Sequence, residues 1–372
     1  MEHTIIDSDG HVHEREEVIV DYLPEPFKGR RELLARPIFP LGDNFHRIAE
    51  GLLDRRQGVR TERGERIEDA GALPIWKGLL DESGIKWSAL YPTRGLYINV
   101  WQSPEWGCAV AQGYNDWLAD AYTSKEPRLK GVALLHLYAI EAAVAELRRC
   151  VRDLKFESAV LMCGGLPAPL GDARYFPLYE EAQRLDIGLA VHGGAADAAG
   201  MNTATALWEV RGMTHASGQI LSFLSMVNGG VFDAFPRLRV AFLEAGCGWI
   251  PYLVDRMDRV YHGRSARLSK RMKNSPREHL AGGRIFVHAE LDEEMLPVVA
   301  KVAGRDDIFM YASDYPHEPW AEMVEELDEF VARDDLSPSL KANTLSTAAI
   351  RFYRLDENGH RVNGDLSPAV GS

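Results

Sequence analysis

Short apolar runs alternate with longer amphipathic segments along most of the chain, and this alternation restricts the fold more than any other feature of the sequence. Most of the runs are rich in Val, Ile, Leu and Ala without polar alternation, as expected of parallel strands covered on both faces. Eight runs are predicted as strands, at residues 4–9, 86–91, 131–137, 158–163, 187–192, 238–244, 285–290 and 308–314.

The segments between these runs have the 3.6-residue period of amphipathic helices. In residues 140–154 apolar side chains recur every three or four positions, with charged residues on the other face. Residues 175–185 and the segment after Trp320 repeat this pattern. Eight strands, each followed by a helical stretch, favour a closed (β/α)₈ TIM barrel over an open doubly wound sheet. We therefore expect an α/β protein with one barrel over residues 1–355.

Two regions do not fit the repeat. Residues 24–84 form a long, Arg-rich insertion with Pro and Gly between the first two predicted strands. A loop of this length usually has a role, so we expect a cap over the barrel mouth or an oligomer contact, with a solvated excursion as the alternative. Residues 356–372 are polar and contain Gly and Pro, which predicts an extended or disordered tail.

The charge and cysteine content exclude several classes of function. The chain has 42 Lys and Arg against 55 Asp and Glu, a net charge of −13, which argues against binding to nucleic acid or an anionic membrane. No apolar run approaches the roughly 18–20 residues of a membrane span, and the start lacks the features of a signal peptide. The cysteines, at positions 108, 150, 163 and 247, are far apart and predict reduced thiols in a cytoplasmic protein.

Carboxylates and imidazoles stand at the carboxyl ends of the predicted strands, where the active sites of barrels lie. Asp9 and His11 are two positions apart on the first strand, so their side chains leave it on the same face. His192 ends the fifth strand and Asp314 ends the eighth, and both can converge with that pair inside a barrel. Two His and two carboxylates suit Zn²⁺ or Mn²⁺ and leave positions open for water or substrate, so we predict a metal site.

Other polar residues near strand ends have plainer interpretations. His136 follows an apolar strand and is expected to be a hydrogen-bonded core or rim residue. Asp7 is expected to bond the backbone or orient a neighbouring loop. His13 would face a metal only if the first strand stayed regular past Gly10, so we expect it behind the ligands or beside the substrate.

The chain resembles the amidohydrolase-related family typified by aminocarboxymuconate-semialdehyde decarboxylase and γ-resorcylate decarboxylase, within the amidohydrolase superfamily. The resemblance extends over nearly the whole barrel. The stretches that carry it are Ile6-Asp7-Ser8-Asp9-Gly10-His11, Tyr91-Pro92-Thr93, Tyr114-Asn115-Asp116-Trp117-Leu118, Ala143-Val144-Ala145-Glu146-Leu147-Arg148-Arg149, Val191-His192, Glu244-Ala245-Gly246-Cys247-Gly248-Trp249-Ile250-Pro251 with Arg256-Met257-Asp258, and Ser313-Asp314-Tyr315-Pro316-His317.

The resemblance implies roles for individual residues. It gives Asp9, His11 and His192 as metal ligands, and Asp314 as both a ligand and a proton-transfer group. Many decarboxylases of the family have a His at the end of strand six that acts as acid or base, and here that position is Glu244. A carboxylate can accept a proton or bind a metal, but it cannot stabilise an anion. Glu244 therefore departs from the decarboxylase pattern.

Two reactions follow from these residues, and the sequence leaves both open. In non-oxidative decarboxylation of a small carboxylated or ring-derived metabolite, an acid protonates the ring carbon as CO₂ leaves; the family favours this branch. In hydrolysis, metal-activated water attacks an amide, a lactone or a C–C bond, and Glu244 favours that branch. A third interpretation is a barrel that binds a ligand without catalysis. The presence of all four predicted ligands, Asp9, His11, His192 and Asp314, argues against it. The expected cofactor is one divalent ion, Zn²⁺ before Mn²⁺.

Further residues are candidates for substrate contact or catalysis. Arg94 lies just past strand two, where it could clamp a substrate carboxylate, with a surface salt bridge as the alternative. Arg256 matches a family Arg that can reach the neighbouring subunit's pocket, and a structural Arg on a helix face is the alternative. His215, in the loop after strand five, is a catalytic candidate, and His288 at strand seven is a substrate-binding one. Family habit implies a homodimer or a higher homo-oligomer.

Overall fold

A computed structural model describes residues 3–40, 71–194, 207–263 and 271–362, and all structural statements refer to these residues. Their eight strands form one sheet in the order β1 to β8, and each neighbouring pair is parallel. The strands are β1 (Ile5–Val12), β2 (Ile85–Pro92), β3 (Leu129–Leu134), β4 (Ser158–Met162), β5 (Gly188–His192), β6 (Arg239–Phe242), β7 (Ile285–His288) and β8 (Phe309–Met310). Every predicted strand is present.

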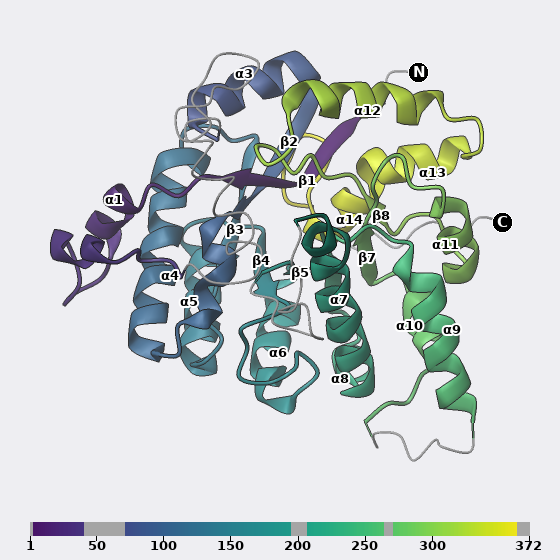
Figure 1. The fold of residues 1–372 in the computed structure, drawn as a ribbon, viewed down its shortest axis with the longest axis horizontal. Coiled ribbons are helices and arrows are strands. Elements are labelled where there is room, and N and C mark those ends of the chain that lie inside the picture. Colours follow the sequence, from purple (N-terminus) through teal and green to yellow (C-terminus); the bar gives the residue numbers. More distant parts are fainter. Residues whose placement is uncertain (1–2, 41–70, 195–206, 264–270, 363–372) are drawn as a thin grey trace.

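Backbone hydrogen bonds close the ring between the first strand and the chain that follows β8. The amide of Ser8 donates to the carbonyl of Tyr311 at 2.9 Å, and the amide of Asp314 donates to the carbonyl of Asp9 at 3.0 Å. The helices lie outside the strands (Figure 1). The predicted (β/α)₈ TIM barrel is therefore confirmed.

Helices and single turns connect the strands. The α-helices are α1 (Glu16–Ile19), α3 (Leu73–Ser83), α4 (Pro104–Leu118), α5 (Ile140–Arg152), α6 (Phe176–Leu185), α7 (Leu207–Asn228), α8 (Val231–Ala234), α9 (Trp249–His262), α10 (Pro276–Ala281), α11 (Leu296–Ala303), α12 (Trp320–Ala332), α13 (Pro338–Ala342) and α14 (Ala348–Tyr353). Shorter turns include η1 (Val20–Tyr22), η2 (Arg31–Ala35) and η4 (Arg94–Val100). Within the described ranges, no helix combines the length and apolar character needed to cross a bilayer.

Aromatic packing from α14 fills the amino-terminal end of the barrel. Phe352 is fully buried, and its ring lies 5.6 Å from that of Phe286 on β7. A Cβ on Gly188, the first residue of β5, would lie 2.4 Å from the Phe352 ring, so only Gly fits there. The interior of this end is therefore filled by the Phe352 ring, and the open face is expected at the carboxyl ends of the strands.

Several strands end earlier than predicted, β6 and β8 among them. Glu244 has φ 52° and Asp314 has φ 48°, both in the left-handed region that interrupts a strand. β6 ends at Phe242, two residues before Glu244, and β8 ends at Met310, four residues before Asp314, whereas the sequence predicted strands up to residues 244 and 314. Each carboxylate thus belongs to a turn that follows a strand.

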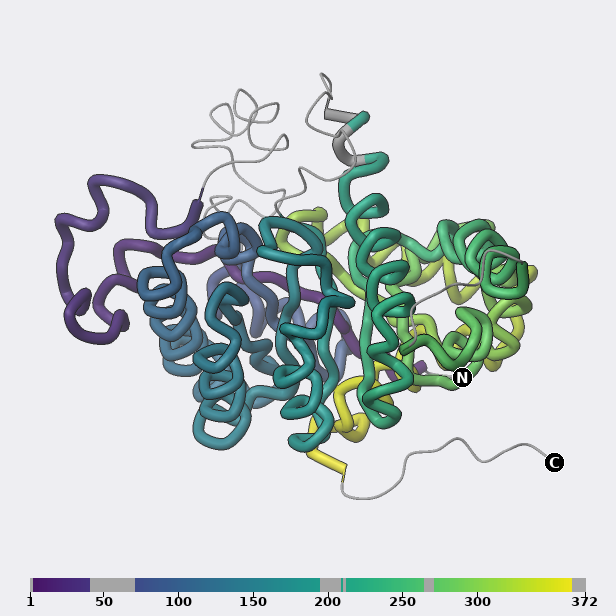
Figure 2. Tube along the Cα trace, turned by 90° about the horizontal axis from the view of Figure 1, so that it is seen from below, coloured from purple at the N-terminus to yellow at the C-terminus, as the bar shows by residue number. Residues whose placement is uncertain are grey.

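The chain between β1 and β2 is described in part. In Figure 2 the purple segment with α1, η1 and η2 projects from the barrel beside α4. Residues 41–70 lie outside the described residues, so the cap predicted for residues 24–84 stays a prediction. α3 packs back onto the barrel, where Trp76 is fully buried and its Nε1 donates to the carbonyl of His11 at 3.1 Å.

The start of the predicted tail does not run out as an extended arm. The amide of Asp356 donates to the carbonyl of His360 at 2.8 Å, and Val362 donates to Arg354 at 2.9 Å, which folds the chain into a turn. Trp87 Nε1 holds this turn through the carbonyl of Asp356 at 3.1 Å. Residues 363–372 lie outside the described residues.

Candidate metal centre

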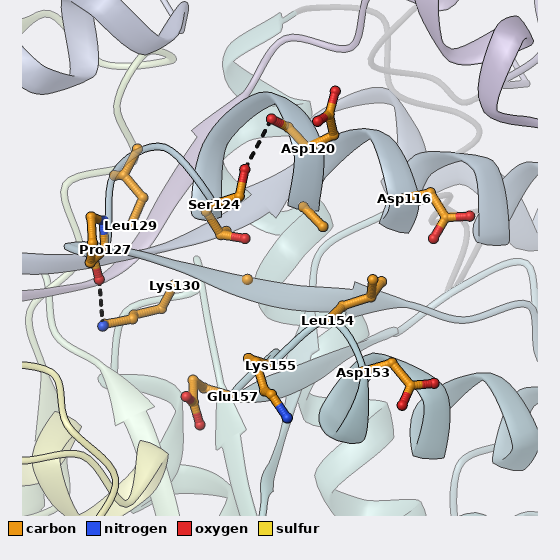
Figure 3. Close-up of a pocket in the computed structure, with 13 residues that line it drawn as sticks. Asp116, Asp120, Ser124, Pro127, Leu129, Lys130, Asp153, Leu154, Lys155 and Glu157 are labelled. Atoms are coloured by element: carbon orange, nitrogen blue, oxygen red, sulfur yellow. Dashed lines mark hydrogen bonds between the residues drawn. The ribbon is translucent and has the colours of Figure 1, made fainter.

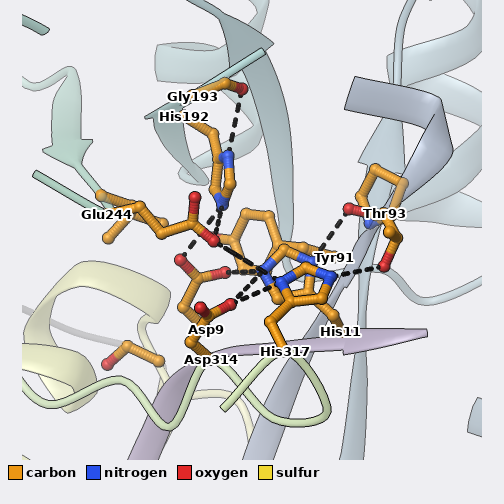
Figure 4. A network of polar contacts seen from close by, with 12 residues as sticks. Asp9, His11, Tyr91, Thr93, His192, Gly193, Glu244, Asp314 and His317 are labelled. Atoms are coloured by element: carbon orange, nitrogen blue, oxygen red, sulfur yellow. Dashed lines mark hydrogen bonds and ion pairs between the residues drawn. The ribbon is translucent and has the colours of Figure 1, made fainter. Parts of the chain in front are cut away.

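Carboxylates and imidazoles from four strand ends converge inside the mouth of the barrel (Figure 4). One group, with possible ligand atoms all within 4.8 Å of one another, comprises Asp9, His11, His192 and Glu244. A second group comprises His11, Glu244, Asp314 and His317. The two groups share His11 and Glu244, and each residue offers one ligand atom, so they describe a single centre. Three of the four predicted ligands, Asp9, His11 and His192, lie in the first group, and Asp314 lies in the second.

The separations between the facing atoms suit one small cation. His11 Nε2 lies 3.5 Å from Asp9 Oδ1, 3.2 Å from Glu244 Oε1 and 3.4 Å from Asp314 Oδ1. His192 Nε2 lies 3.3 Å from Asp9 Oδ2 and 3.3 Å from Glu244 Oε1. Ligands about 2.1 Å from one ion lie about 3.0 Å apart at right angles and about 3.4 Å apart at tetrahedral angles. The observed separations fall in that range or just above it.

Hydrogen bonds to the backbone fix which nitrogen of each histidine faces the centre. His11 Nδ1 lies 2.9 Å from the carbonyl of Pro92, and His192 Nδ1 lies 3.1 Å from that of Gly193. A carbonyl only accepts, so each Nδ1 carries a hydrogen. In the neutral rings both Nε2 lone pairs point at the carboxylates, as in histidines that bind metal ions.

The innermost polar atoms have no hydrogen-bond partner. Asp9 and His11 are fully buried, as is His192, yet both Asp9 oxygens and both Nε2 atoms lack a hydrogen bond within the described part of the chain. Burying polar groups in this state is costly unless a cation satisfies them. The donor set, imidazole nitrogen and carboxylate oxygen, fits a divalent ion such as Zn²⁺ or Mn²⁺.

The pKa shifts of Glu244 and Asp314, the two site residues with left-handed backbone conformation, are opposite in direction. Burial and the neighbouring charge of Glu244 raise the pKa of Asp314 above its usual range. Burial opposes ionisation of Glu244 as well, but His192, His11 and His215 outweigh it and hold the pKa of Glu244 well below its usual range. Without a cation, the site therefore favours ionisation of Glu244 over that of Asp314.

Glu244 also contacts a histidine from outside the sheet. His215 Nδ1 lies 3.0 Å from Glu244 Oε2, while Glu244 Oε1 faces His11 and His192. The sequence predicted His215 in a loop, but it lies in α7. The ring reaches Glu244 by passing over Gly193, where a Cβ would lie 2.7 Å from His215 Cδ2. Glu244 thus connects the centre to an imidazole on α7.

His317 is a site residue to which the sequence analysis gave no role. Its Nδ1 lies 2.7 Å from Asp314 Oδ1, and its Nε2 lies 2.9 Å from Thr93 Oγ1. Its ring also lies 4.3 Å from that of His11, centre to centre. The Asp-x-x-His spacing from Asp314 to His317 was the available signal.

The predicted substrate-contact residues lie in different surroundings. Arg94 Nη1 is bonded to Glu16 Oε1, which is the salt bridge given as the alternative for Arg94. Arg256 lies on the exposed side of α9. His288 is buried at the end of β7, with its Nδ1 3.7 Å from Glu290 Oε1 and without a hydrogen bond in the described structure. Of the three, His288 is the one with a buried, unsatisfied polar atom.

The plainer interpretations hold for two of the other polar residues. Asp7 accepts from the amides of Asp9 and Ser313 and from the hydroxyls of Ser88 and Ser313, so it joins β1 to its two neighbours in the ring. His136 Nε2 donates to the carbonyl of Trp101 at 2.7 Å.

His13 is half-buried behind the centre. Burial and the nearby positive charges of His317, His11 and Arg94 lower its pKa to about 3. It is absent from both groups of possible ligands.

A second hollow lies at the opposite end of the barrel and has a different character. It has a volume of about 560 Å³ and lies at the amino ends of β3 and β4 (Figure 3). Lys130 Nζ and Lys155 Nζ, both on its wall, bond backbone carbonyls, and Asp116 is paired with Arg149. None of the predicted site residues lines it.

Comparison with known proteins agrees with the barrel. 2-Amino-3-carboxymuconate-6-semialdehyde decarboxylase of Dictyostelium discoideum is 27% identical over 272 residues, which is 72% of each chain. A gamma-resorcylate decarboxylase of Rhodococcus jostii is 31% identical over 195 residues, or 48% of this chain and 57% of that protein. A solved 5-carboxyvanillate decarboxylase of Novosphingobium aromaticivorans, with bound manganese, superposes with a TM-score of 0.71 at 21% identity, covering 94% of this chain and 97% of the other.

The amidohydrolase family profile matches residues 88–355. This region includes most of β2, all of β3 to β8 and the positions of His192, Glu244 and Asp314, while the Asp9 and His11 pair on β1 precedes it. The match covers more than two thirds of the sequence, and the chain therefore belongs to the amidohydrolase family.

Proposed function

We propose that this protein is a metal-dependent decarboxylase that removes CO₂ from a small, carboxylated ring compound. The observation that carries the proposal is the cluster of buried, unsatisfied atoms of Asp9, His11 and His192 at the barrel mouth. The names of the relatives support the reaction, because both curated relatives described above are decarboxylases of carboxylated substrates.

One divalent ion is proposed as the cofactor, held by Asp9, His11, His192 and Asp314. When bound, such an ion supplies positive charge that attracts substrate oxygen atoms and acidifies a coordinated water. The expectation of zinc is not supported by the 5-carboxyvanillate decarboxylase and the dihydroxybenzoic acid decarboxylase of Polaromonas, whose solved structures are described with manganese. Mn²⁺ is therefore the ion to test first and Zn²⁺ the second.

The proton is proposed to move through side chains around the cluster. Decarboxylation breaks the bond between the ring carbon and its carboxylate, releases CO₂ and places a proton on that carbon. Asp314, at 23% side-chain exposure, is the proposed proton-transfer carboxylate. His215 is proposed to act in place of the strand-six His that the family resemblance implies, with Glu244 orienting it through the 3.0 Å contact.

Substrate recognition is proposed to involve His288 first. Its buried Nδ1 at the end of β7 is available for a polar group of the substrate. Arg94 and Arg256 remain weaker proposals, since Arg94 is bonded to Glu16 and Arg256 lies on the outside of α9.

The direct test is release of CO₂ from 5-carboxyvanillate and γ-resorcylate by the purified protein loaded with Mn²⁺. In D₂O the product should carry deuterium at the carbon that lost its carboxylate. Asp314→Asn should lower kcat by about 10² or more, in line with loss of a proton-transfer group. Release of CO₂ at the same rate by Asp314→Asn would contradict the assigned role, and no CO₂ from any carboxylated ring compound would contradict decarboxylation.

Addition of water is the second candidate reaction. It is favoured by Glu244, whose pKa is held low, so that it is a carboxylate suited to act as base or ligand. A 2-keto-4-carboxy-3-hexenedioate hydratase of Sphingobium is 28% identical over 116 residues, 30% of this chain. A product heavier by one water, without CO₂, would select this reaction.

A homodimer is proposed, together with a cytoplasmic location. Support for the dimer comes from neighbouring helices α7 and α9, where Met213 is 50%, Tyr252 70% and Val260 48% exposed. Tyr252→Glu should shift the mass measured by light scattering to that of a monomer, while Val331→Glu on α12 should not. A single mass for all three proteins would contradict this interface. The four free cysteines support a reducing compartment.

A further inference from the structure

The contacts of His317 leave neither of its ring nitrogens free for a metal ion. With Asp314 ionised, its carboxylate only accepts, so His317 Nδ1 carries the hydrogen of the 2.7 Å bond. In the neutral ring, Nε2 then accepts from the Thr93 hydroxyl, 2.9 Å away. The Asp314 carboxylate thus selects the tautomer, and the Thr93 hydroxyl satisfies the other ring nitrogen and restrains the ring.

The hydrogen bonds that link Thr93, His317 and Asp314 reach across three consecutive strands of the ring. Thr93 follows β2, Asp314 and His317 follow β8, and β1 lies between them. The His317 ring packs over that of His11 on β1 at 4.3 Å. The three side chains therefore connect the loops on both sides of the strand that supplies the ligand pair Asp9 and His11.

Asp314 needs such support more than the other proposed ligands do. Asp9 lies on a strand and is fully buried, whereas Asp314 lies in a turn with φ 48° and has 23% side-chain exposure. Backbone bonds hold the Asp314 main chain, through its amide to Asp9 and its carbonyl to His317 and Glu318. For the carboxylate, the hydrogen bond from His317 is the one that the structure describes.

We propose that Thr93 and His317 form a positioning pair that holds the Asp314 carboxylate in place for the metal ion. His317 is a positioning residue and not a ligand, although its Nδ1 lies within the cluster of possible ligand atoms. The inference rests on the proposed function, because it takes Asp314 as a ligand. It adds two residues that act on the centre through Asp314.

Metal affinity tests the pair without reference to any substrate. Binding of Mn²⁺ to the metal-free protein would be measured by titration calorimetry, with the electron paramagnetic resonance spectrum of bound Mn²⁺ as a second readout. Partners that orient metal ligands typically contribute about 10- to 100-fold in affinity. We expect His317→Phe to weaken Mn²⁺ binding within this range while one ion still binds per chain. Thr93→Val should weaken binding less, and Thr93→Ser, which keeps the hydroxyl, should bind as the parent does.

Two reference variants separate the outcomes. Asp9→Asn shows the effect of losing a ligand, and Asp314→Asn shows whether Asp314 is one. The Tm of the metal-free protein should be the same for the parent and for Thr93→Val. If Thr93 had only a structural role, Thr93→Val would lower this Tm and leave the spectrum of bound Mn²⁺ unchanged. Parent-like binding by His317→Phe and Thr93→Val, with weakened Asp314→Asn, would overturn the positioning role alone.

The remaining results also decide the question. Loss of binding in His317→Phe as complete as in Asp9→Asn would make His317 a ligand and overturn the proposal. Parent-like binding by Asp314→Asn would refute the ligand set of the proposed function, and the positioning role with it. Weakened binding in Thr93→Val that Thr93→Ser restores supports the pair.

Discussion

Replacing Gly193 by Ala should slow the proposed enzyme strongly although it adds only a methyl group. A Cβ at this position would lie 2.7 Å from His215 Cδ2, 2.8 Å from Nε2 and 3.0 Å from Cε1. Unbonded carbon atoms prefer about 3.5 Å or more, so the ring must retreat by about 0.8 Å. Because the ring is the end of a side chain, it can swing away and leave the backbone in place.

The retreat would separate His215 from Glu244. Their contact is now 3.0 Å between Nδ1 and Oε2, an ordinary hydrogen-bond distance, and a retreat of about 0.8 Å would take it out of hydrogen-bond range. A misplacement of about 1 Å in a reacting group can cost about 10² in rate, and a general acid or base contributes about 10² to 10⁴. We therefore expect kcat of Gly193→Ala to fall about 100-fold, with little change in KM.

The assay is initial-rate release of CO₂ by Mn²⁺-loaded protein, with metal content measured in parallel. Gly212→Ala is the matched control, because it makes the same change on α7 next to His215 and its Cβ would meet no atom within 4 Å. It should keep full activity and stabilise the helix by about 0.5–1 kcal/mol. His215→Ala gives the lower limit of the rate.

Two results would refute this reasoning. Gly193→Ala with the parent rate, beside an impaired His215→Ala, would mean that the ring adapts without leaving its position. Parent rates in both variants would mean that His215 has no role in the reaction. Loss of metal from Gly193→Ala would instead show that the change acts on His192, its neighbour and proposed ligand.

Three further predictions concern the metal, acid stability and the core. Removing metal with a chelator should abolish CO₂ release and lower the Tm measured by scanning calorimetry. Added Mn²⁺ should restore both the activity and the Tm of the parent, but neither in His11→Gln. Hydrogen bonds from Arg184 and Arg148 lower the pKa of Glu181 to about 2 from 4.5, so this carboxylate stabilises the fold above about pH 4.5 and the benefit is lost as pH falls towards about 2. Glu181→Gln should accordingly unfold at lower urea than the parent at pH 6, and the gap should narrow by pH 3; a constant gap would contradict this. Phe352→Ala should cost about 3–5 kcal/mol in urea unfolding at pH 7, because it empties the floor of the barrel, and a cost below about 1 kcal/mol would contradict that packing.

Much of the fold could be predicted because its signals are local. A strand buried on both faces must be continuously apolar, and a helix covering it must be amphipathic, so each element can be recognised from neighbouring residues alone. The proposed ligand pair of Asp9 and His11 follows from the two-residue period of a strand. His192 and Asp314 follow from their places at strand ends, since parallel strands of a barrel all end at the same face.

Residues that reach the centre from outside the strands could not be predicted in this way. The position of His215 depends on how α7 packs over Gly193, and that of His317 on a turn that begins at a left-handed Asp314. The same holds for Arg94, whose bond to Glu16 joins the turn after β2 to α1.

The sequence by itself determined the barrel and the end at which the proposed site and its candidate ligands lie, because strand and helix periods are properties of consecutive residues. Only the tertiary structure decided that Glu244 directs one carboxylate oxygen at His11 in the candidate metal centre and the other oxygen at His215. It also decided that Thr93 and His317 support Asp314. These contacts join residues far apart in the chain, and their geometry depends on how helices and turns pack around the ring.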